Sequence, residues 1–144
     1  MTKNIERTLS IIKPDAIKAN YSGKIIDLIE SKGFFILAQK RITLSAIEAE
    51  VFYNIHRDKS FFSDLVSFMT SAPISVQVLE KENAVNSYRL LMGATDSNLA
   101  EEGTIRKLYG SNIQNNAVHG SDSPENAEVE IKFFFSGLEL LSKT

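Results

Sequence analysis

The sequence contains no cysteine, and this absence excludes several kinds of chemistry. A chain without thiols forms no disulfide bond, has no thiolate nucleophile and offers no zinc–thiolate site. The sequence also lacks an excess of positive charge, because 16 lysine and arginine residues stand against 18 aspartate and glutamate residues, giving a formal net charge of −2. Non-specific nucleic-acid binding depends mainly on basic residues that displace counterions from phosphates. A nucleic-acid partner is therefore not expected, although a local basic patch for a small anion is compatible with this balance.

Long apolar segments are absent as well. No apolar run approaches the roughly 20 residues that a transmembrane helix needs, and the polar start from Met1 to Arg7 lacks the apolar centre of a signal peptide. We find no internal repeat, low-complexity tract or linker rich in proline and glycine. Hydrophobic residues make up 43% of the 144 residues, which is enough to bury a core. We therefore expect one domain over residues 1–144, a cytoplasmic location and no membrane partner.

Short runs of alternating apolar and polar residues predict strands, because this period is typical of a half-buried strand. The clearest alternation lies at 74–78, where the sequence is ISVQV. Periodicity disappears between Gly93 and about Asn115, and a loop this long in a compact domain is usually functional. The predicted strands are 9–11, which ends before Pro14, then 34–42, 74–78 and a short strand near 117–118.

Capping residues mark the starts of the predicted helices. Ser45 and Glu48 have the spacing of a capping box, and Asn83 is predicted to cap a later helix. The order of elements indicates a mixed α/β or α+β layer fold, without deciding which strands run parallel. The predicted helices begin at Ser22, with its end near Gly33, then at Ser45, at about Phe61 with its end at Met69, at Asn83, and at Ser123 with Pro124 in the first helical position.

His119 is the first candidate for a chemical role. It ends a short apolar pair, and Gly120 after it is expected to leave space beside the imidazole and let the chain turn. On a helix that starts at Pro124, Glu130 falls inside the apolar stripe, where a carboxylate is costly unless it is paired. An imidazole N–H is a fitting partner, since a carboxylate stabilises developing positive charge on the ring. Two alternatives stay open: His119 is a surface or core-edge residue, and Glu130 reaches solvent or a lysine.

Cationic and aromatic residues form a second group of candidates. Arg89 lies at the edge of the apolar face of its helix, and Arg106 lies in the long loop. Guanidinium groups suit phosphate oxygens, which they grip in bidentate fashion, and Lys13 at the end of a strand also suits an anion. A helix cannot bury the adjacent Phe61 and Phe62 on the same spot, so one of them is available to stack on a base. The alternatives are solvated charges for the cations, and core or interface packing for both rings.

Taken in this order, the segments closely resemble the nucleoside diphosphate kinase family, in particular bacterial members with a short C-terminus. The resemblance covers nearly the whole chain without an evident gap, and the segment around His119 is the most specific. The matching segments are 8–16 (TLSIIKPDA), 52–53 with His56, 61–62, 92–95 (MGAT), 103–106 (GTIR), 116–123 (NAVHGSDS), 127–128 and 130–131.

Membership of this family implies an α/β (α+β) ferredoxin-like sandwich, in which helices cover a four-stranded antiparallel sheet and a long loop serves the nucleotide site. It implies ping-pong transfer of the γ-phosphate of a nucleoside triphosphate such as ATP to a diphosphate such as GDP, through a phosphohistidine, in maintenance of the (d)NTP pool. Mg²⁺ would be held mainly by nucleotide phosphates, and family members assemble into homo-oligomers, either tetramers or hexamers. The implied catalytic residues are His119, Glu130 and Lys13, and the implied nucleotide-binding residues are Lys13, Tyr53, His56, Phe61, Arg89, Thr95, Arg106, Ile113 and Asn116.

Three places depart from the usual pattern of the family. Ile55 stands before His56 where an acidic residue is common, and Val129 stands where a basic residue is common. Lys107-Leu108 replaces a pair that is commonly small and acidic. The first departure concerns the fine positioning of His56, and none of them removes a residue that the resemblance assigns to phosphate transfer.

Two other classes of function remain as alternatives. A nucleotide-binding regulatory protein could use the same pocket without turnover, but the intact His119 and Glu130 disfavour it. A nucleic-acid-binding module on a ferredoxin-like sheet is the second alternative. The net charge of −2 and the lack of a strand motif that combines basic and aromatic residues disfavour it. Broad base specificity is expected of the leading hypothesis, because stacking on a phenylalanine ring reads no hydrogen-bonding edge.

Overall fold

The centre of the protein is a four-stranded sheet in a computed structural model, of which residues 4–141 are described. The strand order is β2-β3-β1-β4, and every neighbouring pair is antiparallel. This arrangement confirms the sheet implied by the family resemblance, which the hydrophobic pattern alone did not determine. The strands are β1 (Ile5–Ile12), β2 (Phe35–Ile42), β3 (Ile74–Glu82) and β4 (Val118–Gly120).

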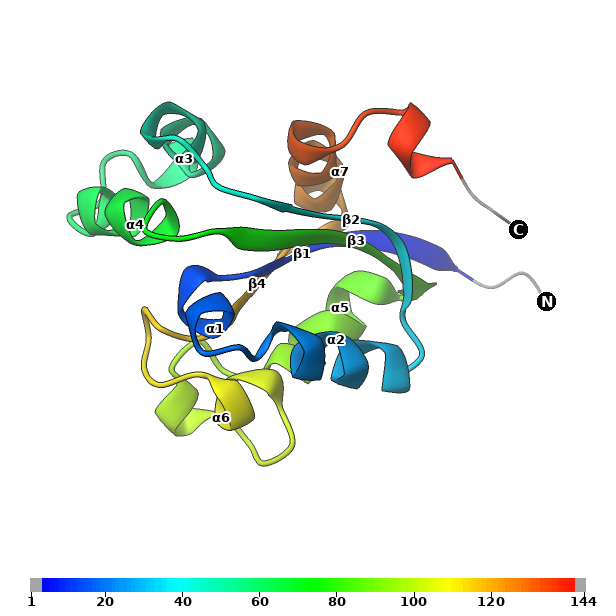
Figure 1. The fold of residues 1–144 in the computed structure, drawn as a ribbon. Helices are drawn as coiled ribbons and strands as arrows, with labels where there is room; N and C mark the ends of the chain where they lie inside the picture. Colours follow the sequence, from blue (N-terminus) through cyan, green and yellow to red (C-terminus); the bar gives the residue numbers. More distant parts are fainter. Residues whose placement is uncertain (1–3, 142–144) are drawn as a thin grey trace.

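Helices cover both faces of this sheet. They are α1 (Pro14–Lys18), α2 (Ser22–Ser31), α3 (Ala46–Phe52), α4 (Phe62–Met69), α5 (Ala84–Met92), α6 (Ile105–Tyr109) and α7 (Pro124–Phe134), with 3₁₀ turns at Asn54–His56, Ser97–Leu99 and Leu138–Leu140. Helices α3, α4 and α7 lie over one face, whereas α1, α2, α5 and α6 lie on the other side (Figure 1). The short strand β4 forms one edge of the sheet, and β2 forms the other.

The alternation of side chains along β1 and β3 supplies two hydrophobic cores. Leu9 and Ile11 join the core under α4 and α7 together with Val76, and all three side chains are fully buried. Ile12 and Leu79 point to the opposite face and join the core under α2 and α5. Burial of apolar surface on both faces is the main force that fixes the register of the central strands.

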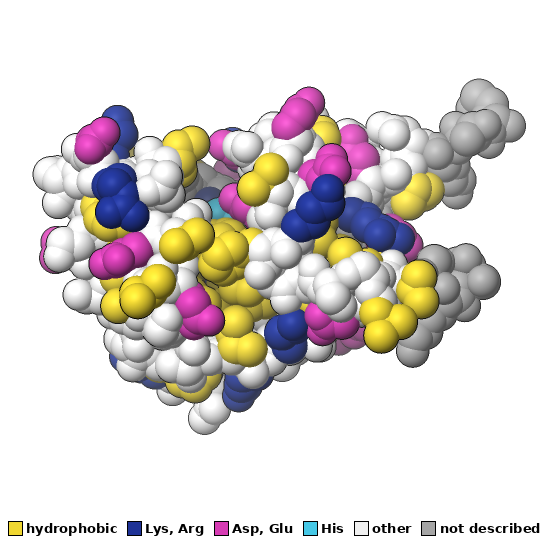
Figure 2. Space-filling model, turned by 90° about the horizontal axis from the view of Figure 1, so that it is seen from above, with side chains coloured by type: hydrophobic (Ala, Val, Ile, Leu, Met, Phe, Trp, Pro, Cys, Tyr) yellow, Lys and Arg dark blue, Asp and Glu magenta, His cyan; other side chains and the backbone are white. Residues whose placement is uncertain are grey.

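The face that carries α3, α4 and α7 is not evenly covered. Seen from above, hydrophobic side chains gather in a hollow between the α3 and α4 side and the α7 side, and a histidine lies at its margin (Figure 2). Partly buried residues that pack against this core include Leu37, Ile42 and Phe52. The side of α3 that carries Phe52 therefore contributes to the core and also borders an open part of the surface.

Of three predicted helix caps, one is formed as expected and the other two differ from the prediction. The capping box of Ser45 and Glu48 is present, with both reciprocal hydrogen bonds formed. Asn83 occupies the cap position of α5 as predicted, but it adopts a left-handed conformation (φ 55°) and its side chain makes no cap hydrogen bond among the described residues. The carboxylate of Glu6 on β1 accepts a hydrogen bond from the N–H of Val85 instead, at 3.2 Å. A carboxylate at a helix N-terminus also complements the helix dipole.

The predicted cap at Ser22 is wrong. Ser22 is the first residue of α2, and Tyr21 occupies the cap position without a side-chain cap bond in the described structure. The Ser22 hydroxyl accepts a hydrogen bond from Arg41 Nη2 at 3.0 Å. Local sequence does not distinguish these two uses of a serine, because Arg41 is brought to it only by the folded sheet.

The boundaries of several elements differ from the predictions. Strand β3 continues to Glu82, well beyond position 78, and the segment predicted to lack regular structure contains α6 and a 3₁₀ turn. Helix α1, with five residues, was not predicted. Elements of one or two turns contain too few residues to show a helical period, which explains the helices that were missed. Across residues 4–141, no helix has both the length and the apolar character needed to cross a bilayer.

Candidate active site

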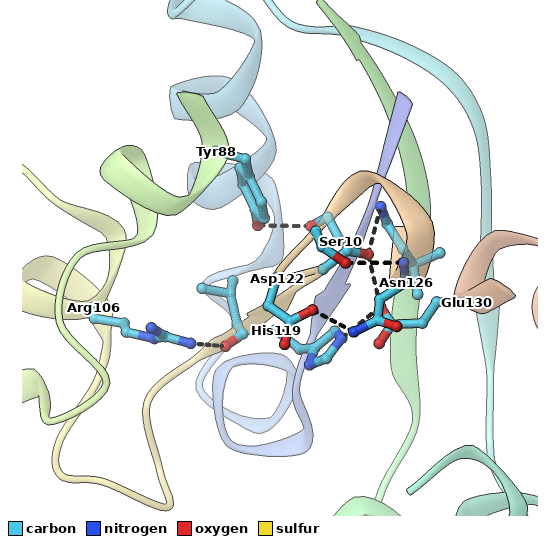
Figure 3. A network of polar contacts seen from close by, with 11 residues as sticks. Ser10, Tyr88, Arg106, His119, Asp122, Asn126 and Glu130 are labelled. Atoms are coloured by element: carbon cyan, nitrogen blue, oxygen red, sulfur yellow. Dashed lines mark hydrogen bonds and ion pairs between the residues drawn. The ribbon is translucent and has the colours of Figure 1, made fainter. Parts of the chain in front are cut away.

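His119 and Glu130 come together from β4 and α7 (Figure 3). Nε2 of His119 lies 3.0 Å from Oε1 of Glu130, and the two side chains are 21% and 22% exposed. The structure thus brings together the two residues that helical phasing had paired. A carboxylate favours the tautomer with the proton on the facing nitrogen, and Nδ1 then carries the free lone pair. Within the described part of the chain, no residue forms a hydrogen bond with Nδ1.

Ser121 supports this pair and was not predicted as a site residue. Its hydroxyl donates to Glu130 Oε1 at 2.7 Å and accepts from the backbone N–H of Leu9 at 3.3 Å. Ser121 is almost fully buried, so these two bonds fix its hydroxyl without competition from water. The spacing contained a signal, since residues i and i+2 of an extended chain point the same way and Ser121 follows His119 by two positions.

Aromatic rings surround the imidazole on the α3 side. The Phe52 ring lies 5.6 Å from the His119 ring in an edge-to-face arrangement, and the Tyr53 ring lies 6.3 Å away. Tyr53 is buried, and its hydroxyl has no hydrogen-bond partner among residues 4–141. Burial raises the pKa of the Tyr53 hydroxyl above its usual value, and the charge of Glu130 acts in the same direction. The Tyr53 hydroxyl is therefore a neutral donor that is buried and without a partner in the described structure.

Two arginines face a small polar cavity of about 280 Å³. Arg89 is exposed on α5, whereas Arg106 on α6 is only 9% exposed. The volume is near the lower end for a small-molecule pocket, which suits a phosphate group better than a whole nucleotide. The cavity is lined by Arg89, Met92, Gly93, Ala94, Thr95, Arg106 and Gly120.

Arg106 also ties the long loop to β4. Its Nη1 donates to the carbonyl of Gly93 at 3.0 Å. Its Nη2 donates to the carbonyl of Val118 at 2.9 Å (Figure 3). Nε is buried without a partner among the described residues. Burial lowers the pKa of the guanidinium, and the nearby charge of Arg89 lowers it further. An anion in the cavity would relieve both effects.

Lys13 and Asn116 form a third contact of the site. Lys13 Nζ donates to Asn116 Oδ1 at 2.9 Å, and Asn116 Nδ2 donates to the carbonyl of Thr95 at 3.0 Å. Asn116 is 2% exposed, so its carboxamide is a fixed bridge between β1 and the long loop. Burial, together with the charge of Arg106, lowers the pKa of Lys13 to about 8, although Asp15 opposes this shift.

The backbone between Asn116 and His119 is strained. Ala117 has a φ of 74°, a region that residues with a side chain rarely adopt, at a cost of about 1–3 kcal/mol. The N–H of Val118 donates to the carbonyl of Asn116 at 2.8 Å, which closes a γ-turn around Ala117. The carbonyl of Ala117 accepts from the backbone N–H of Lys13 at 2.8 Å. The turn therefore joins the start of β4 to the end of β1.

Gly120 has a different role from the one expected. It lies within β4, opposite Ser10, and does not adopt a positive φ. A Cβ atom at this position would come within 2.6 Å of Met92 Cε and 2.8 Å of Tyr88 Cδ2. Glycine thus allows β4 to pack closely on α5, and the prediction that it lets the chain turn is wrong.

The residues predicted to contact the base are Phe61, at the start of α4, and Ile113, in the long loop. Phe61 is 47% exposed, and its ring lies 5.4 Å from the ring of His56. Phe62 is partly buried against the core, so the structure assigns core packing to Phe62 and leaves Phe61 accessible. Ile113 is 62% exposed in the long loop. The placement of a base between Phe61 and Ile113 remains a prediction.

The site residues thus form separate groups on the two sides of β4. His119 contacts Glu130 on α7, whereas the cavity that Arg89 and Arg106 line lies on the α5 side. Strand β4 is an edge strand, so no further strand of the described structure lies beside it. Within residues 4–141, no group of three histidine, aspartate or glutamate side chains is placed to hold a metal ion.

The positions that depart from the family pattern lie on the surface. Ile55 is 78% exposed, Val129 is 69% exposed and Leu108 is 50% exposed. Lys107 is exposed beside Leu108 on α6. None of them takes part in the hydrogen bonds of the site described above, and nothing in the structure explains these substitutions.

Comparison with known proteins places the chain in a family. The sequence profile described as nucleoside diphosphate kinase matches residues 6–140. A nucleoside diphosphate kinase of Geobacter sulfurreducens is 56% identical over 137 residues, which cover 95% of this chain and all of the relative. The chain therefore belongs to the nucleoside diphosphate kinase family.

Solved structures agree with this assignment. The nucleoside diphosphate kinase of Aquifex aeolicus superposes with a TM-score of 0.93 at 44% identity, covering 95% of this chain and 99% of that one. A halophilic nucleoside diphosphate kinase of Halobacterium salinarum, solved in complex with CDP, has a TM-score of 0.93 at 39% identity and covers 96% and 93% of the two chains. These similarities confirm the fold that the resemblance implied.

The contacts of Ser121 generate a first prediction. Ser121→Ala removes the hydrogen bond to Glu130 and leaves the buried N–H of Leu9 without an acceptor, so we expect the free energy of unfolding to fall by about 1–3 kcal/mol. Urea unfolding measures this change. The matched control is Ser31→Ala, because the Ser31 hydroxyl bonds only to the nearby carbonyl of Leu28 on an exposed helix end. Equal stability of Ser121→Ala and Ser31→Ala would contradict the support assigned to Ser121.

Proposed function

We propose that this chain transfers the γ-phosphate of a nucleoside triphosphate to a nucleoside diphosphate in a ping-pong reaction through a phosphohistidine at His119. The observation that carries the proposal is the orientation of the imidazole, whose Nε2 faces Glu130 and whose Nδ1 makes no hydrogen bond within the described structure. Two arginines beside the same strand supply positive charge for an anionic substrate. Membership of the family, whose relatives are named nucleoside diphosphate kinases, supports the same reaction.

In the first half-reaction, Nδ1 of His119 attacks the γ-phosphorus in line with the leaving oxygen. The N–P bond forms, the P–O bond to the β-phosphate breaks, and the nucleoside diphosphate leaves. Glu130 stabilises the positive charge that develops on the imidazole, and Ser121 holds the carboxylate in place. In the second half-reaction, a terminal oxygen of another diphosphate attacks the phosphorus. The new P–O bond forms, the N–P bond breaks, and the electron pair returns to Nδ1 of the neutral ring.

The remaining residues position the phosphates, as phosphoryl transfer requires. We assign Lys13, Arg89 and Arg106 to the phosphate oxygens, since these cations gather around the end of β1 and the cavity. The exposed ring of Phe61 is the proposed stacking face for the base, which would accept every base. Further proposed contacts to the nucleotide come from Tyr53, His56, Thr95, Ile113 and Asn116.

A divalent metal ion fits this site only together with the nucleotide. The charged side chains that line the cavity are arginines, which would repel a free cation. Mg²⁺ keeps most of its ligands as water and phosphate oxygens, and it would neutralise charge on the phosphates. We therefore assign Mg²⁺ to the phosphates of the bound nucleotide.

Isotope transfer tests the phosphohistidine directly. Incubation with γ-labelled ATP and Mg²⁺ should label the protein with a phosphate that is labile to acid and stable to alkali, and unlabelled GDP should remove the label. The control is His56→Gln, which should still be labelled, whereas His119→Gln should not. Equal labelling of His119→Gln would refute the assignment. Tight nucleotide binding without any label would favour a regulatory protein without turnover.

The pKa of Lys13 predicts a pH dependence. Because the pKa in the folded chain is about 8, below the ordinary value of 10.5, Lys13 loses its proton as the pH rises through about 8. A charged hydrogen bond to phosphate contributes about 1.5–3 kcal/mol, so KM for the diphosphate should rise about tenfold or more once Lys13 is neutral. Steady-state kinetics across this range measure the change.

Lys13→Gln provides the test of that assignment. We expect its KM to be raised already at neutral pH and to stay flat as the pH rises through about 8. The matched control is Lys18→Gln, which removes an exposed lysine of the same helix region and should keep the wild-type profile. An unchanged pH dependence in Lys13→Gln would assign the titration to another group.

We further propose that residues 1–144 form one domain that assembles into a homo-oligomer, and that the enzyme acts in the cytoplasm on the (d)NTP pool. The match of the family profile to residues 6–140 supports the single domain. Strand β2 supports assembly, because it is an edge strand of eight residues whose outer side pairs with no strand in the described structure. Such edges readily pair with another chain.

Sedimentation tests the assembly. The purified protein should sediment at a multiple of its 16.1 kDa mass at micromolar concentration. Phe35, at the start of β2, is 53% exposed, and we expect Phe35→Asp to shift the protein toward smaller species. Val129→Asp, which changes an exposed apolar residue on α7, should not have this effect. A wild-type monomer would refute assembly, and an unaltered Phe35→Asp oligomer would exclude this edge.

A further inference from the structure

We propose that Asp15 is a positioning residue, whose carboxylate holds the strained turn at Ala117 and thereby places the phosphate-binding residues and His119. The inference rests on the proposed function, because it concerns how the nucleophile is held. Asp15 is the second residue of α1, directly after the Lys13-Pro14 corner at the end of β1. Its Oδ2 accepts a hydrogen bond from the backbone N–H of Ala117 at 3.1 Å, across 102 positions of sequence.

The turn needs an external support. A residue with a Cβ atom persists at a φ of 74° only where its surroundings hold it there. Ala117 is fully buried, so its N–H would have no access to water if Asp15 were lost. The backbone of Lys13 holds the carbonyl of Ala117, and the carboxylate of Asp15 holds the N–H. Asp15 is therefore the one side chain in these contacts that fixes the turn.

Residues on both sides of the turn belong to the site. Asn116, immediately before it, bridges Lys13 Nζ and the carbonyl of Thr95. Val118, immediately after it, accepts the Arg106 hydrogen bond through its carbonyl, and His119 is the next residue. A change of the backbone at Ala117 would rotate both neighbours together. The carboxylate thus acts on the reaction through geometry and does not itself touch the substrate.

A rival explanation is that Asp15 acts through its charge on Lys13. Burial raises the pKa of the Asp15 carboxyl group, and Oδ1 is buried without a hydrogen-bond partner among the described residues. A role in charge would depend on the ionised carboxylate, whereas a role in holding the turn needs only an oxygen acceptor. Asp15→Asn separates the two, since the carboxamide keeps an oxygen acceptor of the same reach and has no charge.

The experiment is a double-mutant cycle that combines Asp15→Ala with Ala117→Gly. Glycine adopts a positive φ without strain, so the turn should no longer depend on Asp15 in that background. Single-turnover labelling of His119 measures the rate of phosphoryl transfer, and steady-state kinetics separate kcat from KM. We expect Asp15→Ala to slow the transfer about tenfold or more, because small displacements of reacting groups are costly. Asp15→Asn should stay within about threefold of wild type, and Ala117→Gly should restore most of the loss.

Controls keep the outcome interpretable. Asp27→Ala removes an exposed carboxylate from α2 and should leave the rate unchanged. Amide hydrogen exchange at residue 117 gives a readout that does not depend on activity: protection should be high in wild type and Asp15→Asn, and low in Asp15→Ala. Failure of the wild type to form phosphohistidine would overturn the proposed function, yet exchange would still test the tie between Asp15 and Ala117.

Two results would overturn the inference. The first is an Asp15→Ala variant that transfers phosphate at the wild-type rate with full protection at residue 117. The second is an Asp15→Asn variant as slow as Asp15→Ala, with no recovery on adding Ala117→Gly, which would assign the effect to the charge on Lys13.

Discussion

The pairing of β4 with β1 is the interaction on which the whole site depends. Only three residue pairs form this ladder, with His119 opposite Ile11. A ladder this short is weak by itself, and contacts from several other elements reinforce it. Arg106 donates to the carbonyl of Val118, Ser121 accepts from the N–H of Leu9, and Gly120 lets the strand lie close to α5. Each of these contacts also fixes a residue of the site, so the stability of the sheet edge and the geometry of the site have the same physical origin.

The cations of the site are held at an energetic cost. Burial lowers the pKa of both Lys13 and Arg106, and the charge of Arg106 lowers the pKa of Lys13 further. A buried cation that has lost part of its hydration is stabilised more by a bound anion than a fully hydrated cation is. The anion replaces the hydration that the cation lost on folding. The neutral hydrogen-bond partners of these cations, which are the side chain of Asn116 and two backbone carbonyls, compensate only in part. The cost of holding these cations is consistent with the phosphate-binding role proposed for them.

Residue patterns predicted those features that depend on one element at a time. The helical period placed Glu130 on the inner face of α7, and the structure brings it to His119. The capping box at Ser45 was found because both partners lie within four residues. The hydrogen bond from the start of α5 to Glu6 was missed because Glu6 lies on β1, far away in the sequence. The packing role of Gly120 was missed because Met92 and Tyr88 approach it only in the folded state. Strand directions came from the family resemblance, since hydrophobic alternation is the same in parallel and antiparallel strands.

In the reaction proposed above, the two sides of β4 have different roles. In the proposed reaction, Glu130 and Ser121 on the α7 side would act on the imidazole, whose charge would change only as the N–P bond forms, so their effect would be confined to the transition state and the phosphoenzyme. On the α5 side, Arg89 and Arg106 would meet an anion that is charged before, during and after transfer. Interactions of equal strength in the ground state and the transition state lower KM without raising kcat. Both groups are accessible because β4 is an edge strand, whereas a central strand is flanked by a neighbouring strand on each side.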